Sequence, residues 1–391
     1  MKKNLFFFLV AGMAFASCVS DETVGEQGVK EPVKLAFSSP LLQSNKGTRA
    51  NFYGEIGDHM YGGSSTVYKY PQEEDFIIYA VNHEGDFAGW DNLANIPVAF
   101  NGTKISYDQP VDGWAPKTSE GGYYYWPSGK MSFAASSPYD LECVGAERTY
   151  GADGVTIKNF EVNSNAEHHF DLLYSDRTLN QTSENMLDKA DYYSGIPINF
   201  RHALSSVRFS IMNESEAIVL LKKIEVYGVK YKGTFKENLT EDPENYSESK
   251  QNPEWTVGDG MIAKEKAYLG FQGSVLFPIS AQYVAQLAAN DQDEDGEVEE
   301  SHQLLLMPQD LTDDATVVVT YTVNGSLRTK TAKLKDGIVL KTTDETVSTW
   351  EPGTRYTYRL VYGKSAADQD RIYFAPGAEQ WVDHEVIVIN L

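Results

Sequence analysis

The sequence predicts an all-β protein built from two β-sandwich domains. Its 391 residues include 24 Tyr and 18 Phe, and Val, Ile and Thr recur in short runs. Such β-branched and aromatic residues suit the pleated, half-buried surface of a sheet. The short runs alternate with clusters of Gly, Asn, Asp and Pro, which is typical of a sandwich. Because one ordinary sandwich is shorter than this chain, two domains are expected.

Residues 1–17 are predicted to be the signal peptide of a lipoprotein. Lys2 and Lys3 precede an apolar run over residues 5–15, and Ala16-Ser17 precede Cys18. The apolar run is too short to span a bilayer comfortably. After cleavage, Cys18 would carry several acyl chains, which together anchor a protein firmly. This use of Cys18 leaves Cys143 without a partner, so no disulfide is expected.

The next residues indicate a tether followed by an isolated strand. Residues 21–31 are polar and without periodicity, as in a flexible linker. In the strand that follows, Val33, Leu35 and Phe37 alternate on one face. A loop then leads to Arg49-Ala50, a basic candidate for proteolytic cleavage. We therefore divide the mature chain into a tether and first strand (18–49), an N-terminal sandwich (50–195) and a C-terminal sandwich (196–391).

Alternating apolar residues predict further strands in both halves of the chain. In the first half, residues 123–127 and 131–135 are expected to form two strands joined by a tight turn. Residues 280–289 are the one predicted helix, with Ser280 as its N-cap. The remaining predicted strands are residues 76–81, 207–211, 223–229, 317–323, 328–334 and 356–362, with Asn324-Gly325 as a hairpin turn.

Charge and motifs argue against several functions. A formal charge of −23 repels phosphate backbones, so no nucleic-acid partner is expected. The seven histidines show no zinc spacing, and no nucleophile elbow, phosphate loop or dinucleotide fingerprint occurs. We therefore expect neither a cofactor nor an enzyme. A hydrolase remains an alternative, because among 56 acidic residues no single pair of carboxylates is informative.

Two further patterns were weighed as binding sites. Asp291, Asp293 and Asp295, followed by Gly296, imitate the start of a calcium loop, but His302 stands where the twelfth position needs Glu. A solvated acidic loop is the expected structure there. The four aromatic residues 123–126 could stack on sugar rings, although a strand would place half of them in the core.

Several phrases, in this order, resemble those of the fimbrillin and Mfa-like lipoproteins of Bacteroidetes, which are pilus subunits. They are residues 48–50, 124–127 with 133–135, 200–205, 306–309 and 350–358. The resemblance implies two tandem transthyretin-like β-sandwich domains and a lipoprotein on the outer membrane, at the cell surface or in a fimbrium. The acidic residues after Cys18 are similar to the export signals of such lipoproteins.

The resemblance also implies an assembly mechanism. A trypsin-like protease would cut between Arg49 and Ala50 and release the first strand. A strand from another pilus subunit would then fill the groove vacated by Val33, Leu35 and Phe37. On physical grounds, these three side chains would stabilise their site by roughly 1.5–3 kcal/mol each, so their loss exposes an apolar slot. Pairing a neighbour's strand there is β-augmentation, and a head-to-tail contact of this kind grows into a filament.

The C-terminus offers a donor strand for such an exchange. Val386, Ile387, Val388 and Ile389 are strongly strand-prone and lie at the end of the chain. They fit equally well as the closing strand of the second domain. An alternative to polymerisation is a surface lipoprotein that binds a glycan or a host protein.

Overall fold

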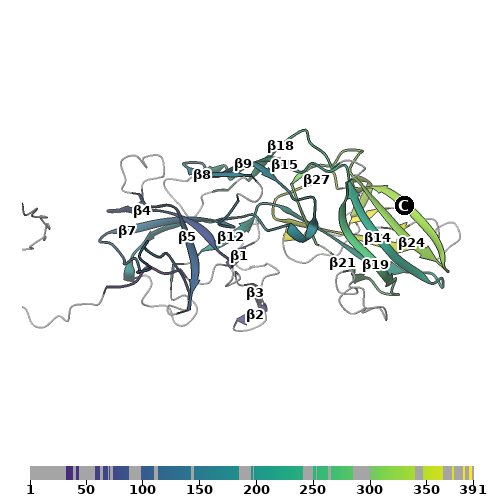
Figure 1. Ribbon diagram of the computed structural model, residues 1–391, viewed down its shortest axis with the longest axis horizontal. Helices are drawn as coiled ribbons and strands as arrows, with labels where there is room; N and C mark the ends of the chain where they lie inside the picture. Colours follow the sequence, from purple (N-terminus) through teal and green to yellow (C-terminus); the bar gives the residue numbers. More distant parts are fainter. Residues whose placement is uncertain are drawn as a thin grey trace, which may run out of the picture.

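Strands dominate the chain and lie in two lobes along its long axis (Figure 1). Short 3₁₀ helices also occur, at Ala166–His168 (η4) and Leu334–Asp336 (η6). The all-β prediction is therefore confirmed. The computed structural model describes residues 32–37, 41–43, 58–61, 65–68, 70, 74–87, 98–109, 113–141, 145–184, 195–196, 198–240, 250–251, 253–262, 266–284, 300–301, 303–339, 347–363, 372–373, 382–383 and 387–389.

The first lobe is built on a mainly antiparallel sheet whose central strands are β4 and β7. Phe76, Ile78 and Ala80 of β4 are buried on one face, as the alternation predicts. Val81, the residue after Ala80, is buried on the other face of β4, so other side chains cover both faces of this part of the sheet. The sheet order is β1 (Leu41–Gln43), β12 (Asn199–His202), β10 (Leu173–Ser175), β7 (Lys130–Ser137), β4 (Phe76–His83), β5 (Val98–Asp108) and β6 (Gly113–Ala115), with β11 (Thr178–Gln181) also paired to β7.

The second lobe is a sandwich of two sheets. In one sheet β13 and β28 run parallel, and in the other β14 and β24 are antiparallel neighbours. The first contains β20 (Gln282–Tyr283), β13 (Ser205–Asn213), β28 (Thr354–Tyr362), β31 (Ile387–Ile389) and β26 (Gly337–Val339), with β22 (Leu304–Leu306), β29 (Ile372–Tyr373) and β30 (Val382–Asp383) at its sides. The second contains β21 (Glu300–Ser301), β19 (Tyr268–Leu276), β14 (Val219–Tyr227), β24 (Thr316–Val323) and β25 (Ser326–Lys333).

A third sheet takes strands from both halves of the sequence and lies between the lobes in Figure 1. Its order is β18 (Glu254–Val257), β15 (Lys232–Lys236), β9 (Gly154–Glu161) and β8 (Glu147–Gly151), so it crosses the expected boundary at residue 195. Three two-stranded pairs complete the described strands: β2 (Asp58–Tyr61) with β3 (Ser65–Tyr68), β16 (Leu239–Thr240) with β17 (Lys250–Gln251), and β23 (Gln309–Asp310) with β27 (Thr349–Trp350).

Among the described residues there are two large apolar cores, and the chain passes between them at more than one place; Leu173 packs in the first core, for example, and its neighbours Leu172 and Tyr174 pack in the second. Phe200 packs in the first core, whereas Ala203 and Leu204 pack in the second. Between them, Arg201 pairs with Asp176, its Nε lying 2.6 Å from Oδ1. Residues 200–205, one of the motifs on which the family resemblance rests, thus form one of the links between the two cores.

Most predicted strands are confirmed. Residues 76–81, 207–211, 317–323 and 356–362 lie within β4, β13, β24 and β28, and the Asn324-Gly325 turn joins β24 to β25 with positive φ at both residues. The helix predicted from Ser280 is wrong at its start, because Gln282 and Tyr283 pair with β13 as β20. Residues 285–289 lie outside the described part of the chain.

The predicted pairing of residues 123–127 with 131–135 is also wrong. Residues 131–135 do form part of β7, but β7 pairs with β4, β10 and β11. Tyr123 and Tyr125 instead form isolated bridges with Lys117 and Lys34. A long-range partner, the first segment of the chain, thus takes the place of the expected local hairpin.

Candidate functional site

The first segment, residues 33–37, lies in a slot between two other parts of the first lobe. One side of the slot is formed by Trp114 and residues 124–126, and the other by Ile196. Five backbone hydrogen bonds hold the segment among the described residues: Leu35 N to Tyr124 O (2.8 Å), Trp126 N to Val33 O (3.0 Å), Phe37 N to Trp114 O (2.7 Å), Trp114 N to Phe37 O (3.1 Å) and Ile196 N to Ala36 O (2.9 Å). The segment therefore completes the pairing of both its neighbours.

Its side chains are part of the first core. Leu35 and Phe37 are each 1% exposed, and Val33 is half-buried. The Phe37 ring meets the rings of Phe133 and Phe76 edge to face, with centroids 5.5 and 6.2 Å apart. Yet the segment forms no continuous ladder: single bridges join Phe37 to Trp114 of β6 and to Ile196, and Lys34 to Tyr125. It is thus deeply buried but only sparsely paired.

The polar side of the segment carries a cation on an aromatic ring. Lys34 Nζ lies 4.0 Å from the centroid of the Tyr123 ring, and Lys117 Nζ lies 3.5 Å from the same centroid. The Tyr123 hydroxyl donates a hydrogen bond to Asp108 Oδ2 (2.7 Å), while Lys117 Nζ contacts Asp108 Oδ1 (2.9 Å). Burial raises the pKa of Asp108, but the hydrogen bonds from Tyr123 and Lys117 outweigh it and hold this pKa below its usual range.

The sequence alone does not identify the polar groups around Lys34. The alternation of Val33, Leu35 and Phe37 assigns no role to Lys34, and no motif includes Asp108 or Lys117. No local pattern reveals them, because Asp108 is the last residue of β5 and Tyr123 follows an irregular loop. Only the fold brings them together with the first segment.

The slot continues along β12. Strand β1 pairs with β12 in parallel, with Leu41 opposite Asn199 and Gln43 opposite Arg201. Residues 33–37 and β1 therefore lie one after the other beside residues 196–201. A cut after Arg49 would separate both from the rest of the chain, so the vacated site would be longer than the predicted first strand alone.

The aromatic residues 123–126 are more accessible than the sequence predicts. Tyr125 is 50% and Tyr124 38% exposed, and Tyr123 and Trp126 are half-buried; none belongs to the buried core. The prediction that half of them are core is wrong, because they are not in a regular strand. The Tyr124 ring packs edge to face on Phe100, with centroids 5.1 Å apart.

The C-terminal strand lies inside the second lobe. Ile387 and Val388 pair in parallel with Tyr358 and Arg359 of β28, and β31 also pairs with β26. Just before it, β30 extends the same edge of β28. Val386 lies outside the described residues. In the single chain, the donor candidate thus occupies the position of a closing strand.

Other predicted sites lie outside the described part of the chain: Cys18, Arg49, Ala50 and the acidic residues Asp291, Asp293 and Asp295. Among the residues that are described, no group of three or more His, Cys, Asp or Glu could hold a metal ion. A search of the same residues found no helix with the length and hydropathy of a membrane span.

Residues of the motifs 200–205, 306–309 and 350–358 have structural roles. His202 is buried, with its Nδ1 2.5 Å from Asp171 Oδ2. Trp350 Nε1 donates to the Tyr358 hydroxyl (3.0 Å). Gln309 accepts a hydrogen bond from Lys230 N (2.7 Å) and donates one to Lys230 O (3.0 Å). These side chains fix turns and strands of the second lobe and its junction with the first.

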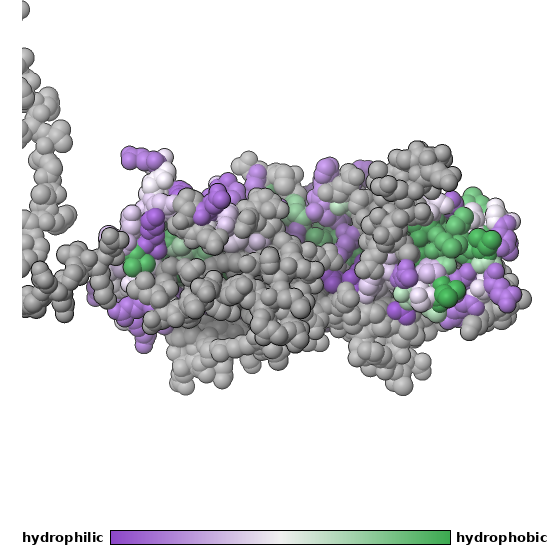
Figure 2. All heavy atoms as spheres, turned by 90° about the horizontal axis from the view of Figure 1, so that it is seen from below, coloured by the Kyte–Doolittle hydropathy of each residue, from purple (hydrophilic) through white to green (hydrophobic). Residues whose placement is uncertain are grey.

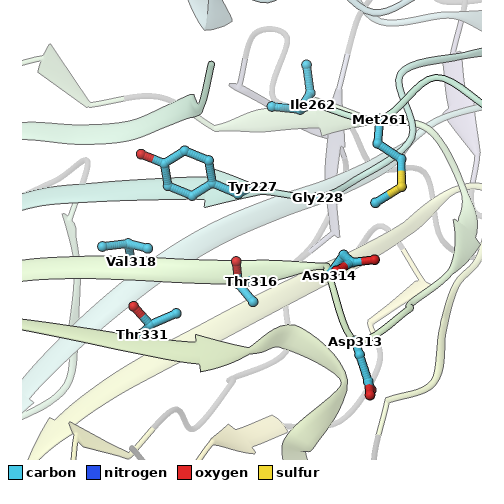
Figure 3. A pocket seen from close by; sticks show the side chains of 9 residues that line it. All are labelled: Tyr227, Gly228, Met261, Ile262, Asp313, Asp314, Thr316, Val318 and Thr331. Atoms are coloured by element: carbon cyan, nitrogen blue, oxygen red, sulfur yellow. The ribbon is translucent and has the colours of Figure 1, made fainter. Parts of the chain in front are cut away.

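A cleft of about 500 Å³ opens on the second lobe, over β14 and β24 (Figure 3). At Gly228, where φ is 70°, a side chain would collide with the carbonyl oxygen of Asp314, so this wall needs glycine. Asp313 at the rim pairs with Lys333 and Lys335, which lower its pKa. The lining mixes hydroxyl, carboxylate and apolar groups: Tyr227, Gly228, Met261, Ile262, Asp313, Asp314, Thr316, Val318 and Thr331.

Apolar side chains also gather at the end of the second lobe farther from the first (Figure 2). The register places Leu276, Leu220, Thr322 and Leu327 in one row across β19, β14, β24 and β25. Leu276 and Leu327 are exposed, as are Ile218 and Ile279. Exposed apolar clusters of this kind suit protein contacts.

Together, a strand-filled slot and side chains that fix turns and strands lie in an all-β framework, as in a protein whose role is structural. The sequence profile of the Fimbrillin-like family, Mfa_like_1, matches residues 71–381, and the chain belongs to this family. It is accordingly a Fimbrillin-like protein, a member of a structural family and not an enzyme. Membership also implies a location at the cell surface and association with a pilus.

Solved structures similar to the chain include several proteins from Bacteroides. A candidate cell adhesion protein from Bacteroides uniformis is 14% identical, with a TM-score of 0.43, over 92% of this chain and 97% of that one. Another from Bacteroides ovatus is 10% identical, with a TM-score of 0.42, over 92% and 98%. A fimbrial protein from Bacteroides ovatus is 13% identical, with a TM-score of 0.33, over 85% and 49%. No curated protein matches the chain.

Proposed function

We propose that this chain is a pilus subunit or adhesin that polymerises by strand exchange. It consists of two tandem transthyretin-like sandwiches (50–195 and 196–391), is exported as an outer-membrane lipoprotein with lipid on Cys18, and is cut between Arg49 and Ala50. The cut frees the first segment, and a strand from another subunit replaces it. Residues 386–389 are a candidate donor, which must first leave β28.

The observation that carries the proposal is the combination of deep burial and sparse pairing in residues 33–37. Leaving the slot would expose the cavity of Leu35 and Phe37 and orphan the backbone groups of Trp114, Tyr124, Trp126 and Ile196. Buried backbone groups without partners are costly, so an empty slot strongly favours a replacement strand. Backbone pairing supplies affinity, and the two apolar pockets supply register.

Mild trypsin treatment of the purified chain tests this function. We expect a new N-terminus at Ala50, followed by ladders on denaturing gels and filaments in electron micrographs. Because trypsin also cleaves after Lys46, the matched control combines Lys46→Gln with Arg49→Gln, and this double variant should keep its first segment and remain monomeric. A chain that is cut at Arg49 but stays monomeric would refute polymerisation. Lipidation is tested separately by palmitate labelling, which Cys18→Ala should abolish.

The exposed tyrosines support a second candidate function, glycan binding without polymerisation. Tyr124 and Tyr125 offer ring faces to solvent, and such faces suit sugar rings. Tyr125→Ala should then abolish retention on immobilised glycans, whereas Tyr139→Ala, at a similarly exposed tyrosine, should not. Trp126→Ala separates recognition from packing, because simple destabilisation would place that residue's role in the fold.

A further inference from the structure

The first segment interacts with two different environments. Its apolar side fills the core, while Lys34 lies against the Tyr123 ring on the exposed side. Tyr123, Lys117 and Asp108 all belong to the part of the chain that remains after a cut at Arg49. Lys117 stays on the ring and on the Asp108 carboxylate. Departure of the segment would therefore vacate one cation position on a ring that its other partners keep in place.

The backbone pairing determines which donor residue reaches this position. Leu35 N bonds to Tyr124 O and Trp126 N bonds to Val33 O, so residue 34 is held between these two contacts. A replacement strand that seats apolar side chains where Leu35 and Phe37 lie must put its preceding residue beside Tyr123. The ring's negative face attracts a cation there, and the ionised Asp108 adds to that attraction.

We propose, on the basis of the strand-exchange function above, that the strand which fills this slot carries Lys or Arg at the position of Lys34. Large apolar residues follow at the positions of Leu35 and Phe37. The Tyr123 ring with Asp108 is then a specificity determinant that selects among donor strands. The apolar pockets alone accept many β-strands, because alternation of large apolar residues is common.

The same pattern recurs inside the chain, where it is permanent. In β13, Arg208 lies between the buried Val207 and Phe209, and its guanidinium carbon is 3.9 Å from the centroid of the Tyr283 ring. A basic residue between two apolar residues, of which at least one is fully buried, thus packs on a neighbouring tyrosine in both lobes. The contact between Arg208 and Tyr283 does not depend on strand exchange.

The chain's own donor candidate lacks this feature. Residues 385–391, Glu-Val-Ile-Val-Ile-Asn-Leu, contain no basic residue in any register. By the proposed criterion they fit the slot of another copy poorly. A different chain whose donor strand contains a basic residue would therefore bind the slot more tightly than a second copy of this chain and would displace it where both are present.

Peptide exchange into the nicked protein tests the selection. A site for a sequence-specific protease is inserted between Arg49 and Ala50 of the chain without its signal peptide, and the protein is cut. Fluorescent peptides of residues 31–44, the same peptide with Lys34→Met, and residues 382–391 are then added, and binding is followed by anisotropy. We expect the Lys34→Met peptide to bind about two- to five-fold more weakly than the parent peptide, and the 382–391 peptide to bind more weakly still.

Variants of the protein test whether the Tyr123 ring causes the preference for a basic residue in the peptide. In Tyr123→Leu, the parent and Lys34→Met peptides should bind equally, whereas Lys117→Met, which keeps the ring, should retain the preference. Equal binding of the two peptides to the unaltered protein, or tighter binding of the 382–391 peptide, would overturn the selection but leave strand exchange intact. If no peptide enters the nicked protein, the removable segment itself is refuted, and the selection with it.

Discussion

Residues 33–37 in the first lobe and residues 207–211 of β13 in the second have the same side-chain pattern but are held differently. Val-Lys-Leu-Ala-Phe and Val-Arg-Phe-Ser-Ile both place a basic residue between two apolar ones, of which at least one is fully buried, and both basic residues lie over a tyrosine ring. β13 forms eight register pairs with β28 and further pairs with β22 and β20. The first segment has only isolated bridges.

The two segments differ in how many backbone hydrogen bonds hold them rather than in how much apolar surface they bury. Apolar burial is similar in the two places, but each backbone hydrogen bond adds about 0.5–1.5 kcal/mol, and β13 has many more of them. A segment that is buried but sparsely paired can be exchanged as a unit, whereas a central strand cannot leave without unfolding its sheet. Four changes would break or sharpen this contrast.

The largest effect is expected from deleting a core ring in each place. Phe37→Ala and Phe209→Ala should each cost about 3–5 kcal/mol of unfolding free energy, measured by urea denaturation. Hydrogen exchange should show where: Phe37→Ala should expose the amides of Trp114 and Ile196, and Phe209→Ala those of β28. Loss of β28 protection in Phe37→Ala would mean that the segment is not an independent unit.

A smaller loss of stability is expected from removing the buried hydrogen bond between Trp350 of β27 and Tyr358 of β28. Tyr358→Phe leaves the buried Trp350 Nε1 without its acceptor, which should cost about 1–3 kcal/mol. Tyr125→Phe, at an exposed ring in the first lobe, is the control and should change stability by less than about 0.5 kcal/mol. Equal stability of Tyr358→Phe and the parent in urea melts would show that another group takes over the bond.

Removing the cation should destabilise the protein more at Arg208 than at Lys34. Arg208 also donates hydrogen bonds to the Tyr283 hydroxyl (2.8 Å) and to Thr357 Oγ1 (2.9 Å), so Arg208→Met should cost roughly 1–2 kcal/mol. Lys34→Met loses only its position on the ring and should cost about 0.5–1 kcal/mol. Thermal melts of both variants test the order, and a larger loss for Lys34→Met would reverse it.

The smallest effect is a pH dependence of segment retention. The lowered pKa of Asp108 means that its ionised form stabilises the folded state above the unfolded pKa of about 3.9, and that this contribution is lost as pH falls through the folded value. The charge of Lys34 is one of the groups that lower this pKa, so protonation of Asp108 also removes an attraction to the first segment, and release of the segment from nicked protein should quicken slightly below about pH 4. Asp108→Asn should remove this step, and a step that persists in the variant must come from another group.

Local patterns were enough to predict much of the framework. Alternation located β4, β13, β24 and β28, and Asn324-Gly325 marked a hairpin. The parallel pairing of β13 with β28 joins residues about 150 apart, as in the bond between Arg208 and Thr357, and no local pattern encodes it. Long-range pairing also explains the two errors: β20 forms because Tyr283 reaches β13, and residues 123–126 are bridged by the first segment.

The candidate site was predictable only on its apolar side. Val33, Leu35 and Phe37 follow a simple alternation, whereas the Tyr123 ring owes its place to Lys117 and Asp108, which come from separate loops and strands. Charge partners of this kind depend on tertiary structure. An acidic chain offers too many carboxylates for any one to be recognised beforehand.

The route of the chain through residues 196–213 has a mechanical consequence for a fibre. The slot borders residues 196–201, which continue directly through the link into β13. A pulling force on a bound neighbour would therefore be transmitted to the long parallel ladder between β13 and β28 and load it in shear. Because many hydrogen bonds must then rupture together, the subunit would resist tension best along the direction in which a pilus is stretched.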